Sequence, residues 1–456
     1  MRIKETIEKQ RAFYESGTTR TYEYRLRALK NLEKAIRQME PEINEALHKD
    51  LNKAPTESYM TEVGMVLSEL RYAKKHLKKW MKKDRVRTPL AQFPSKSFTI
   101  AEPYGVVLIM APWNYPFMLS IEPLIGAIAA GNCVVLKPSA YAKATGDVLE
   151  KLIHMIFPKE FVTIVKGGRE ENAILLDIRF DYIFFTGSVS VGKLVMEKAS
   201  KNLTPVSLEL GGKSPCIIDE TADLNLAAKR LVFGKFLNCG QTCVAPDYVL
   251  VQESVKDELV EKLSVWIHKF YGNDPLECAE YPKMINEKHF ERVCGLMQSG
   301  KIVIGGQTNP DTLQIEPTVL CDVKRDDPVM EEEIFGPVLP LITYRTKSDL
   351  LSYIRSYEKP LALYLFTRKR KMQCWVLSNI SFGGGCINDT VIHLATPYMA
   401  FGGVGASGMG SYHGKQSFET FSHRRSIVKK GLWLDLPMRY HPYTKTKDKL
   451  VRMFVK

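Results

Sequence analysis

Between residues 105 and 200, strongly apolar runs alternate with segments of helical periodicity. This pattern restricts the fold more than any other feature of the chain. Runs as apolar as these are typical of strands buried on both faces, as in a parallel sheet covered by helices. The clearest are GVVLIMAP (105–112), NCVVLKPS (132–139) and YIFFTGS (182–188). We therefore expect an α/β fold.

The flanking regions add to this pattern. Residues 1–83 have the spacing of helices, and residues 85–104 alternate and carry prolines, as in an extended hairpin. A second α/β region begins near residue 212, with a long helix expected at 255–270. A chain of 456 residues suits two or three domains.

Composition limits the classes of function. The net charge of +13 could attract nucleic acid, anionic membrane or an anionic cofactor, but the basic residues are spread out and no nucleic-acid motif occurs. The nine cysteines include no CxxC, which argues against a zinc ribbon or a disulfide scaffold. The charged start is no secretory signal, and no apolar run reaches the length of about 20 residues that a membrane span needs. We expect a cytoplasmic protein without a transmembrane segment, a metal or a nucleic-acid partner.

Three stretches are candidate cofactor sites. FFTGSVSVGKL (184–194) nearly matches a P-loop, but Leu194 lacks the hydroxyl that would bind magnesium. What remains is a glycine turn that opens a helix, whose backbone N–H groups suit a pyrophosphate. LKPSA ends a strand in a lysine, and EEEIFGPVLP has acids and an aromatic ring before a strand, although ordinary turns and surface residues explain each stretch equally well. The candidate residues are Lys137, Gly187, Ser188, Glu333 and Phe335.

Two cysteines, Cys239 and Cys243, lie close together in KFLNCGQTCVAP. A metal site needs about four ligands and a redox pair is usually CxxC, whereas a nucleophile needs a base and an oxyanion donor. Glu209, between leucines in LELGGKSP, should have a raised pKa and could serve as a base, although a salt-bridged glutamate near a turn explains this stretch equally well. Asn114 in APWNYP could donate to an oxyanion. These residue types suit a thiol hydrolase as well as a dehydrogenase, and a binding protein that kept the scaffold is a third alternative.

Five stretches together resemble the aldehyde dehydrogenase superfamily over roughly residues 5–430, and the class 3 or fatty-aldehyde branch in particular. They are PWNYP, FTGS, LELGGKSP, GQTC and EEIFGP, in the family's order. The resemblance implies a Rossmann-like cofactor domain, an α/β catalytic domain, a small β-hairpin oligomerisation element and a basic tail. The implied ranges are 1–87 with 104–211, then 212–411, then 88–103 with 412–438, and finally 439–456.

The resemblance also implies roles. Cys243 would attack an aldehyde, Asn114 and the Cys243 N–H would hold the oxyanion, and Glu209 would activate the water that hydrolyses the thioester. NAD or NADP would take the hydride, and the product would be a carboxylic acid. Lys137 would bind the adenosine ribose, Gly187 and Ser188 the pyrophosphate, Glu333 and Phe335 the nicotinamide ribose and ring, and Tyr59 and Tyr115 the substrate. The branch is usually dimeric.

Five finer expectations follow from the same stretches. Ala140 stands where relatives commonly have an acid that repels a 2′-phosphate, which leaves both cofactors open. Aromatic and apolar residues near Tyr115 and Phe117 favour hydrophobic aldehydes, aliphatic of medium or long chain, or aromatic. We expect a helix dipole or the cofactor's charge to lower the pKa of the Cys243 thiol, and one helical turn to bring Cys239 near it, which would suit reversible oxidation. The tail at 438–456 is too short and charged to span a bilayer, so it lies on an anionic surface or extends the fold.

Overall fold

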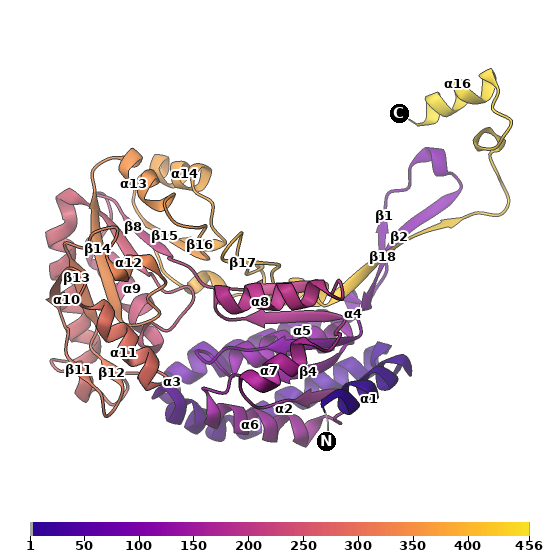
Figure 1. Cartoon of the computed structure of the whole chain (residues 1–456). Helices are drawn as coiled ribbons and strands as arrows, with labels where there is room; N and C mark the ends of the chain where they lie inside the picture. The colour runs from indigo at the N-terminus through magenta and orange to yellow at the C-terminus, as the bar shows by residue number, and fades with distance from the viewer. Residues whose placement is uncertain (1–2, 456) are drawn as a thin grey trace.

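The computed structural model describes residues 3–455. Residues 1, 2 and 456, which belong to the expected cofactor domain and tail, lie outside the described residues. Figure 1 shows two α/β bodies side by side and an arm of strands that reaches away from them. Within residues 3–455 no helix is long and apolar enough to cross a membrane.

The N-terminal region is helical, as predicted. Its main helices are α1 (Ile3–Glu15), α2 (Tyr22–Leu51) and α4 (Gly64–Trp80). The Thr21 side chain caps α2 by accepting from Tyr24 N, and Asn52 ends it in the left-handed conformation. Between α2 and α4 lie the short α3 (Pro55–Ser58) and a π-helical turn, η2 (Tyr59–Val63).

The first body is built on a six-stranded sheet in the order β17-β7-β6-β3-β4-β5. All neighbours are parallel except β17, which pairs antiparallel with β7. The order reverses between β3 and β6, which is the switch point of a doubly wound sheet. The strands are β3 (Val106–Met110), β4 (Cys133–Lys137), β5 (Val162–Ile164), β6 (Tyr182–Thr186), β7 (Val206–Glu209) and β17 (Gly408–Met409).

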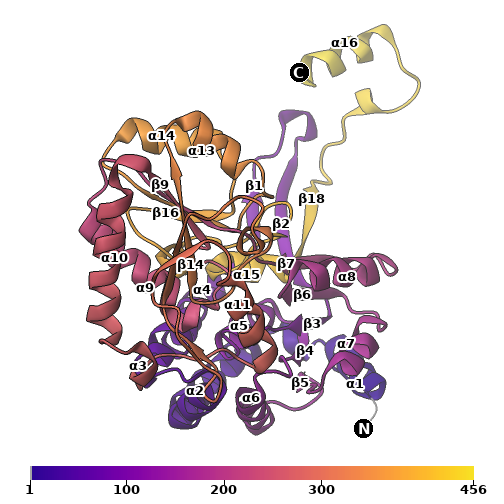
Figure 2. The ribbon, with the colours of Figure 1, turned by 60° about the vertical axis from the view of Figure 1, so that its left-hand side comes forward.

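Helices cover both faces of this sheet (Figure 2). The α5 helix, Met118–Ala130, is buried along its whole length and ends where Gly131 adopts a φ of 97°. The remaining helices of this body are α6 (Lys143–Ile156), α7 (Arg169–Leu176), α8 (Val189–Ser200) and α15 (Gly414–Thr420). The expected strands and helices between 105 and 200 are thus confirmed.

The second body is built on a seven-stranded sheet in the order β10-β13-β14-β9-β8-β15-β16, parallel except for β10. Side chains alternate between two cores: Val249 and Val251 of β9 join one, Tyr248 and Leu250 the other. The strands are β8 (Pro215–Ile218), β9 (Tyr248–Gln252), β10 (Lys301–Ile304), β13 (Thr318–Cys321), β14 (Val338–Tyr344), β15 (Ala362–Phe366) and β16 (Gly384–Ile387). The helices are α9 (Leu224–Phe236), α10 (Lys256–Tyr271), α11 (Glu287–Leu296), α12 (Pro328–Glu331), α13 (Lys347–Ile354) and α14 (Arg370–Asn379), and β11 (Thr308–Asn309) pairs with β12 (Gln314–Ile315).

The arm is a three-stranded antiparallel sheet in the order β1-β2-β18. Its strands are β1 (Asp84–Val86), β2 (Ser95–Pro103) and β18 (Ser422–Lys430). Val86, Ser97 and Val428 lie in register across it, and both valines are more than half exposed. Beyond β18 the chain runs to α16 (Lys445–Phe454), which buries none of its residues and lies at the tip of the arm.

Candidate active site

Four strand ends of the six-stranded sheet bring the predicted residues together. Asn114 follows β3, Lys137 ends β4, Gly187 follows β6 and Glu209 ends β7. The carboxyl ends of parallel strands meet at one edge, and the switch point between β3 and β6 opens there. Residues predicted separately therefore lie at one edge of a single sheet.

A sharp turn after α9 places Cys243. Asn238 and Cys239 have φ values of 52° and 54°, and Gly240 a φ of 71°. A Cβ on Gly240 would lie 2.3 Å from the carbonyl oxygen of Gly336, so only glycine fits. The two cysteines are therefore not one helical turn apart, contrary to expectation.

The cysteines also pack in different cores. Cys239 is fully buried in the second core, where its Sγ lies 3.7 Å from the Tyr281 hydroxyl. Cys243 packs against the first core and lines a cavity. Only Cys243 is therefore placed to meet a substrate.

Asn114 is tied to the cysteine loop through two side-chain amides. Its Nδ2 donates to the carbonyl oxygen of Gln241 at 3.0 Å, and its own carbonyl accepts from Asn238 Nδ2 at 2.8 Å. The Gln241 side chain donates to Asn238 O and Lys283 O, both at 3.0 Å. The Asn114 amide keeps a second N–H for another acceptor.

Glu209 is buried, and among residues 3–455 neither of its carboxylate oxygens has a hydrogen-bond partner. Burial raises its pKa well above the ordinary range, as predicted from the flanking leucines. An orphaned buried carboxyl costs stability, which makes Glu209 a candidate functional residue.

The surroundings of Cys243 disfavour the thiolate form of its side chain. Burial, with the nearby carboxyl groups of Glu333 and Glu209, raises the pKa of the thiol above the ordinary value. The expected lowering by a helix dipole is wrong, because Cys243 lies in a turn and no helix begins there. Glu209 and Glu333 are thus both close enough to Cys243 to affect the pKa of its thiol.

Glu333 approaches the backbone closely. A Cβ on Gly211 would lie 2.0 Å from Glu333 Oε2, so the glycine makes room for the carboxyl. Burial is the main cause that raises the pKa of Glu333 to about 8. A buried ion pair, which the sequence analysis did not predict, holds the segment around Glu333. Lys213 Nζ lies 2.6 Å from Asp247 Oδ2, and Asp247 Oδ1 accepts a hydrogen bond from Ile334 N.

The strand-edge residues fit a dinucleotide. Ser188 caps the 12-residue α8, whose N-terminal N–H groups suit a phosphate. A Cβ on Gly187 would lie 2.6 Å from the Phe185 ring, so only glycine allows this turn. Lys137 donates to Pro138 O at 2.9 Å and Gly167 O at 2.7 Å, and burial lowers its pKa to about 8.

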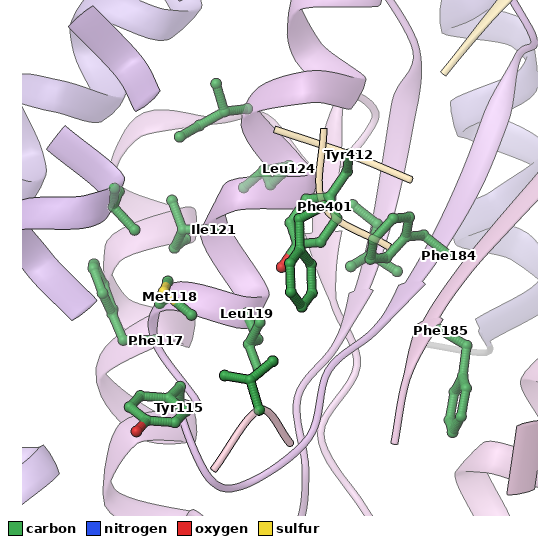
Figure 3. Packing of buried hydrophobic residues seen from close by; sticks show 14 of the residues in the cluster. Tyr115, Phe117, Met118, Leu119, Ile121, Leu124, Phe184, Phe185, Phe401 and Tyr412 are labelled. Carbon is green, nitrogen blue, oxygen red and sulfur yellow. The ribbon is translucent and has the colours of Figure 1, made fainter. Parts of the chain in front are cut away.

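A cavity of about 160 Å³ is lined in part by Cys243. Figure 3 shows Met118 and Leu119 near Tyr115, with Phe401 and Tyr412 nearby. The Tyr115 hydroxyl shares a hydrogen bond of 2.6 Å with Thr242 Oγ1. The lining is mostly apolar: Met60, Thr61, Met65, Tyr115, Met118, Leu119, Phe233, Leu237, Thr242, Cys243, Val244, Val391, Ile392, Leu394, Ala395, Phe401, Tyr412 and His413.

Of the two predicted substrate residues, Tyr115 lines this cavity and Tyr59 does not. Tyr59 is 46% exposed at the start of η2, and the next residues, Met60 and Thr61, line the cavity instead. The prediction of Tyr59 is displaced by one residue from the lining residue Met60, because side chains at successive positions of a helical turn point in different directions.

Comparisons with known proteins agree with this geometry. The aldehyde dehydrogenase family model matches residues 1–427. The chain is 47% identical over 456 residues to 4,4′-diaponeurosporen-aldehyde dehydrogenase of Staphylococcus aureus, covering 100% of this chain and 99% of that one. It is 45% identical over 430 residues to the dimeric NADP-preferring aldehyde dehydrogenase of Rattus norvegicus, covering 94% and 95%.

A solved structure matches as well. Staphylococcus aureus AldH in a substrate-bound state superposes with a TM-score of 0.98 at 47% identity, with 100% of both chains covered. The chain is therefore an oxidoreductase that converts aldehydes to carboxylic acids with NAD or NADP, and it belongs to the aldehyde dehydrogenase family.

Proposed function

We propose that Cys243 is the nucleophile, Asn114 the oxyanion donor and Glu209 the base of this reaction. The observation that carries the proposal is the meeting of three groups around the loop of Cys243: Cys243 lines the cavity, the Asn114 amide donates to Gln241 O of that loop, and Glu209 is close enough to affect the pKa of the Cys243 thiol. They are a thiol, an amide with a second N–H and a buried carboxyl that has no hydrogen-bond partner among residues 3–455. Each is a group that acyl chemistry needs.

The reaction begins when the Cys243 thiol loses its proton to solvent and the sulfur bonds to the aldehyde carbon. The carbonyl oxygen takes the negative charge of the thiohemiacetal, and the second N–H of Asn114 stabilises it. A bound nicotinamide cofactor would accept hydride from that carbon, which would leave the carbon on Cys243 as a thioester.

Hydrolysis then completes the turnover. Glu209 in its ionised form takes a proton from water while the water oxygen adds to the thioester carbon. The carbon–sulfur bond breaks, the carboxylic acid leaves and the electron pair returns to the Cys243 sulfur.

The strand-edge residues would hold the cofactor. In this proposal Lys137 binds the adenosine ribose, and Gly187 and Ser188 lie beside the pyrophosphate. Glu333 binds the nicotinamide ribose and Phe335 packs on the ring. Phe335 has a φ of 49° and meets Trp113 edge-on at 5.3 Å, so its ring is held in one orientation.

The substrate in this proposal is a hydrophobic aldehyde. The cavity beside Cys243 has Tyr115 on one wall, and most of its lining is aliphatic, aromatic or thioether. An apolar cavity of this kind binds aliphatic or aromatic groups by excluding water from them. The polar carbonyl end would then face Asn114.

We also propose a dimer in the cytoplasm, assembled through the arm. The two-valine face formed by Val86 and Val428 is apolar and exposed, and such a face on a projecting sheet suits a protein partner. The rat relative is named dimeric. Residues 439–456 are basic, and α16 carries exposed Leu450 and Met453, which suits weak contact with an anionic membrane surface.

The domain ranges stay a proposal, with 1–87 and 104–211 for the cofactor, 212–411 for catalysis and 88–103 with 412–438 for the arm. Two short elements refine them: β17 pairs with β7 of the first sheet, and Ser417 of α15 packs against Gly126 of α5. Both therefore support the cofactor body although they follow the catalytic one in the chain.

Substitution of the nucleophile tests the proposal. Cys243→Ala should abolish aldehyde-dependent formation of reduced nicotinamide, whereas the neighbouring Cys239→Ser should keep it. The absorbance of the reduced cofactor measures both. Substantial turnover in Cys243→Ala would exclude the assignment, and ester hydrolysis without any aldehyde oxidation would identify a thiol hydrolase instead.

A further inference from the structure

A buried ion pair lies beneath the loop that carries Asn114. Lys53 Nζ is 2.6 Å from Glu62 Oε1, and neither side chain has any exposed surface. Lys53 lies between α2 and α3, and Glu62 lies in the π-helical turn η2. Burying two charges is costly, and the pair compensates only where further hydrogen bonds satisfy it. The other contacts of Lys53 and Glu62 therefore indicate the function of the pair.

Those further partners all belong to one segment, residues 114–118. Lys53 Nζ donates to the carbonyl oxygen of Asn114 at 3.1 Å and lies 3.9 Å from the centre of the Tyr115 ring. Glu62 Oε2 accepts from the backbone N–H groups of Phe117 at 2.9 Å and Met118 at 3.1 Å. The pair thus fixes both the middle of the loop and the start of α5.

We propose that Lys53 and Glu62 are positioning residues for the oxyanion donor. The Asn114 carbonyl is held by the Lys53 ammonium and by the Asn238 amide. With its backbone carbonyl held by two donors, the Asn114 side chain reaches Gln241 O of the cysteine loop and keeps its second N–H for the oxyanion. The inference rests on the proposed role of Asn114.

The pair also links this donor to the substrate wall. Glu62 is in η2, and Met60 and Thr61 of the same turn line the cavity. Tyr115, whose ring lies against Lys53, also lines the cavity, and its hydroxyl hydrogen-bonds to Thr242, the residue before Cys243. One ion pair therefore sets the distance between the wall, the donor and the thiol loop.

The test removes both charges together. Lys53→Met/Glu62→Gln leaves no unpaired buried charge, which a single substitution would, and the glutamine oxygen still accepts from Phe117 N. We expect hydride transfer in a single turnover to slow by about 10- to 100-fold, because a displaced donor loses its alignment with the oxyanion. In the Asn114→Ala background the same double substitution should cost less than about threefold, since the donor is already absent.

A matched control separates positioning from general destabilisation. Arg25 is another buried cation that donates to backbone carbonyls, of Thr19 and Ala129, but it makes none of the contacts to Asn114. Arg25→Met should lower the melting temperature and leave hydride transfer in the folded enzyme unchanged. If Lys53→Met/Glu62→Gln does not fold, Lys53→Arg, which keeps the charge and shifts its position, should show a smaller loss with the same dependence on Asn114.

Two results would overturn the inference: unchanged hydride transfer in the double variant, or an equal loss with and without Asn114. A different result bears on the proposed function. If Asn114→Ala alone leaves hydride transfer intact, Asn114 is not the oxyanion donor, and Lys53 and Glu62 then have no donor to position.

Discussion

The orphaned carboxyl of Glu209 leads to a sharp kinetic prediction for Glu209→Gln. Glutamine keeps the shape of glutamate but does not accept a proton, so the water that hydrolyses the thioester loses its base. General-base catalysis contributes about 10²- to 10⁴-fold, which corresponds to about 2.7–5.4 kcal/mol in the barrier. Because neither Glu209 oxygen bonds to another group, no hydrogen bond is lost and stability should change by less than about 1 kcal/mol.

Rapid mixing of enzyme with excess cofactor and aldehyde separates the two half-reactions. The variant should still release a burst of reduced cofactor, and the steady rate after the burst should fall by at least about 10²-fold. Loss of the burst together with the steady rate would refute the reasoning, because Glu209 would then be essential for thiol attack. An unchanged steady rate would refute it too.

The same residue predicts a pH dependence. Burial raises the pKa of Glu209, so the carboxyl stays protonated at pH values where an exposed glutamate is ionised. Only the ionised form takes a proton from water, so thioester hydrolysis should accelerate as pH rises towards the raised pKa. In Glu209→Gln this acceleration should be absent.

Two further substitutions test cofactor choice and assembly. Ala140, exposed in the loop after β4, leaves room for a 2′-phosphate, so Ala140→Glu should lower kcat/KM with NADP by about tenfold or more and affect NAD less; strict use of NAD by the unsubstituted enzyme would contradict this. Val428→Asp should place a charge on the two-valine face and convert dimer to monomer in sedimentation, and a dimer that persists would locate the interface elsewhere.

Much of the fold and the site follows from local patterns. The strands at 106–110, 133–137 and 182–186 are buried on both faces, and their apolar runs have no other stable environment. The raised pKa of Glu209 followed from its leucine neighbours in the same way. In each case the deciding contacts lie within a few residues along the chain or follow from one sheet.

The expectations that were wrong depend on geometry that no local pattern encodes. Two consecutive left-handed residues at Asn238 and Cys239 turn the chain out of α9, although neither is a glycine. The pKa of the Cys243 thiol is raised first by burial and then by Glu333 and Glu209, which approach it from different sheets. The Lys53–Glu62 pair could not be predicted from the sequence either, since each residue has the local pattern of an ordinary surface charge. Only the packing of α2, η2 and the Asn114 loop buries them together.

The nucleophile and its partners are anchored in different bodies of the molecule. Cys243 lies between α9 and β9 of the seven-stranded sheet, whereas Asn114 and Glu209 extend from the six-stranded one. A proteolytic fragment of the second body alone therefore carries the Cys243 thiol without the Asn114 amide or the Glu209 carboxyl. Efficient oxidation of an aldehyde is expected only where the two bodies have packed together, because the oxyanion donor and the hydrolytic base reach the thiol from the other sheet.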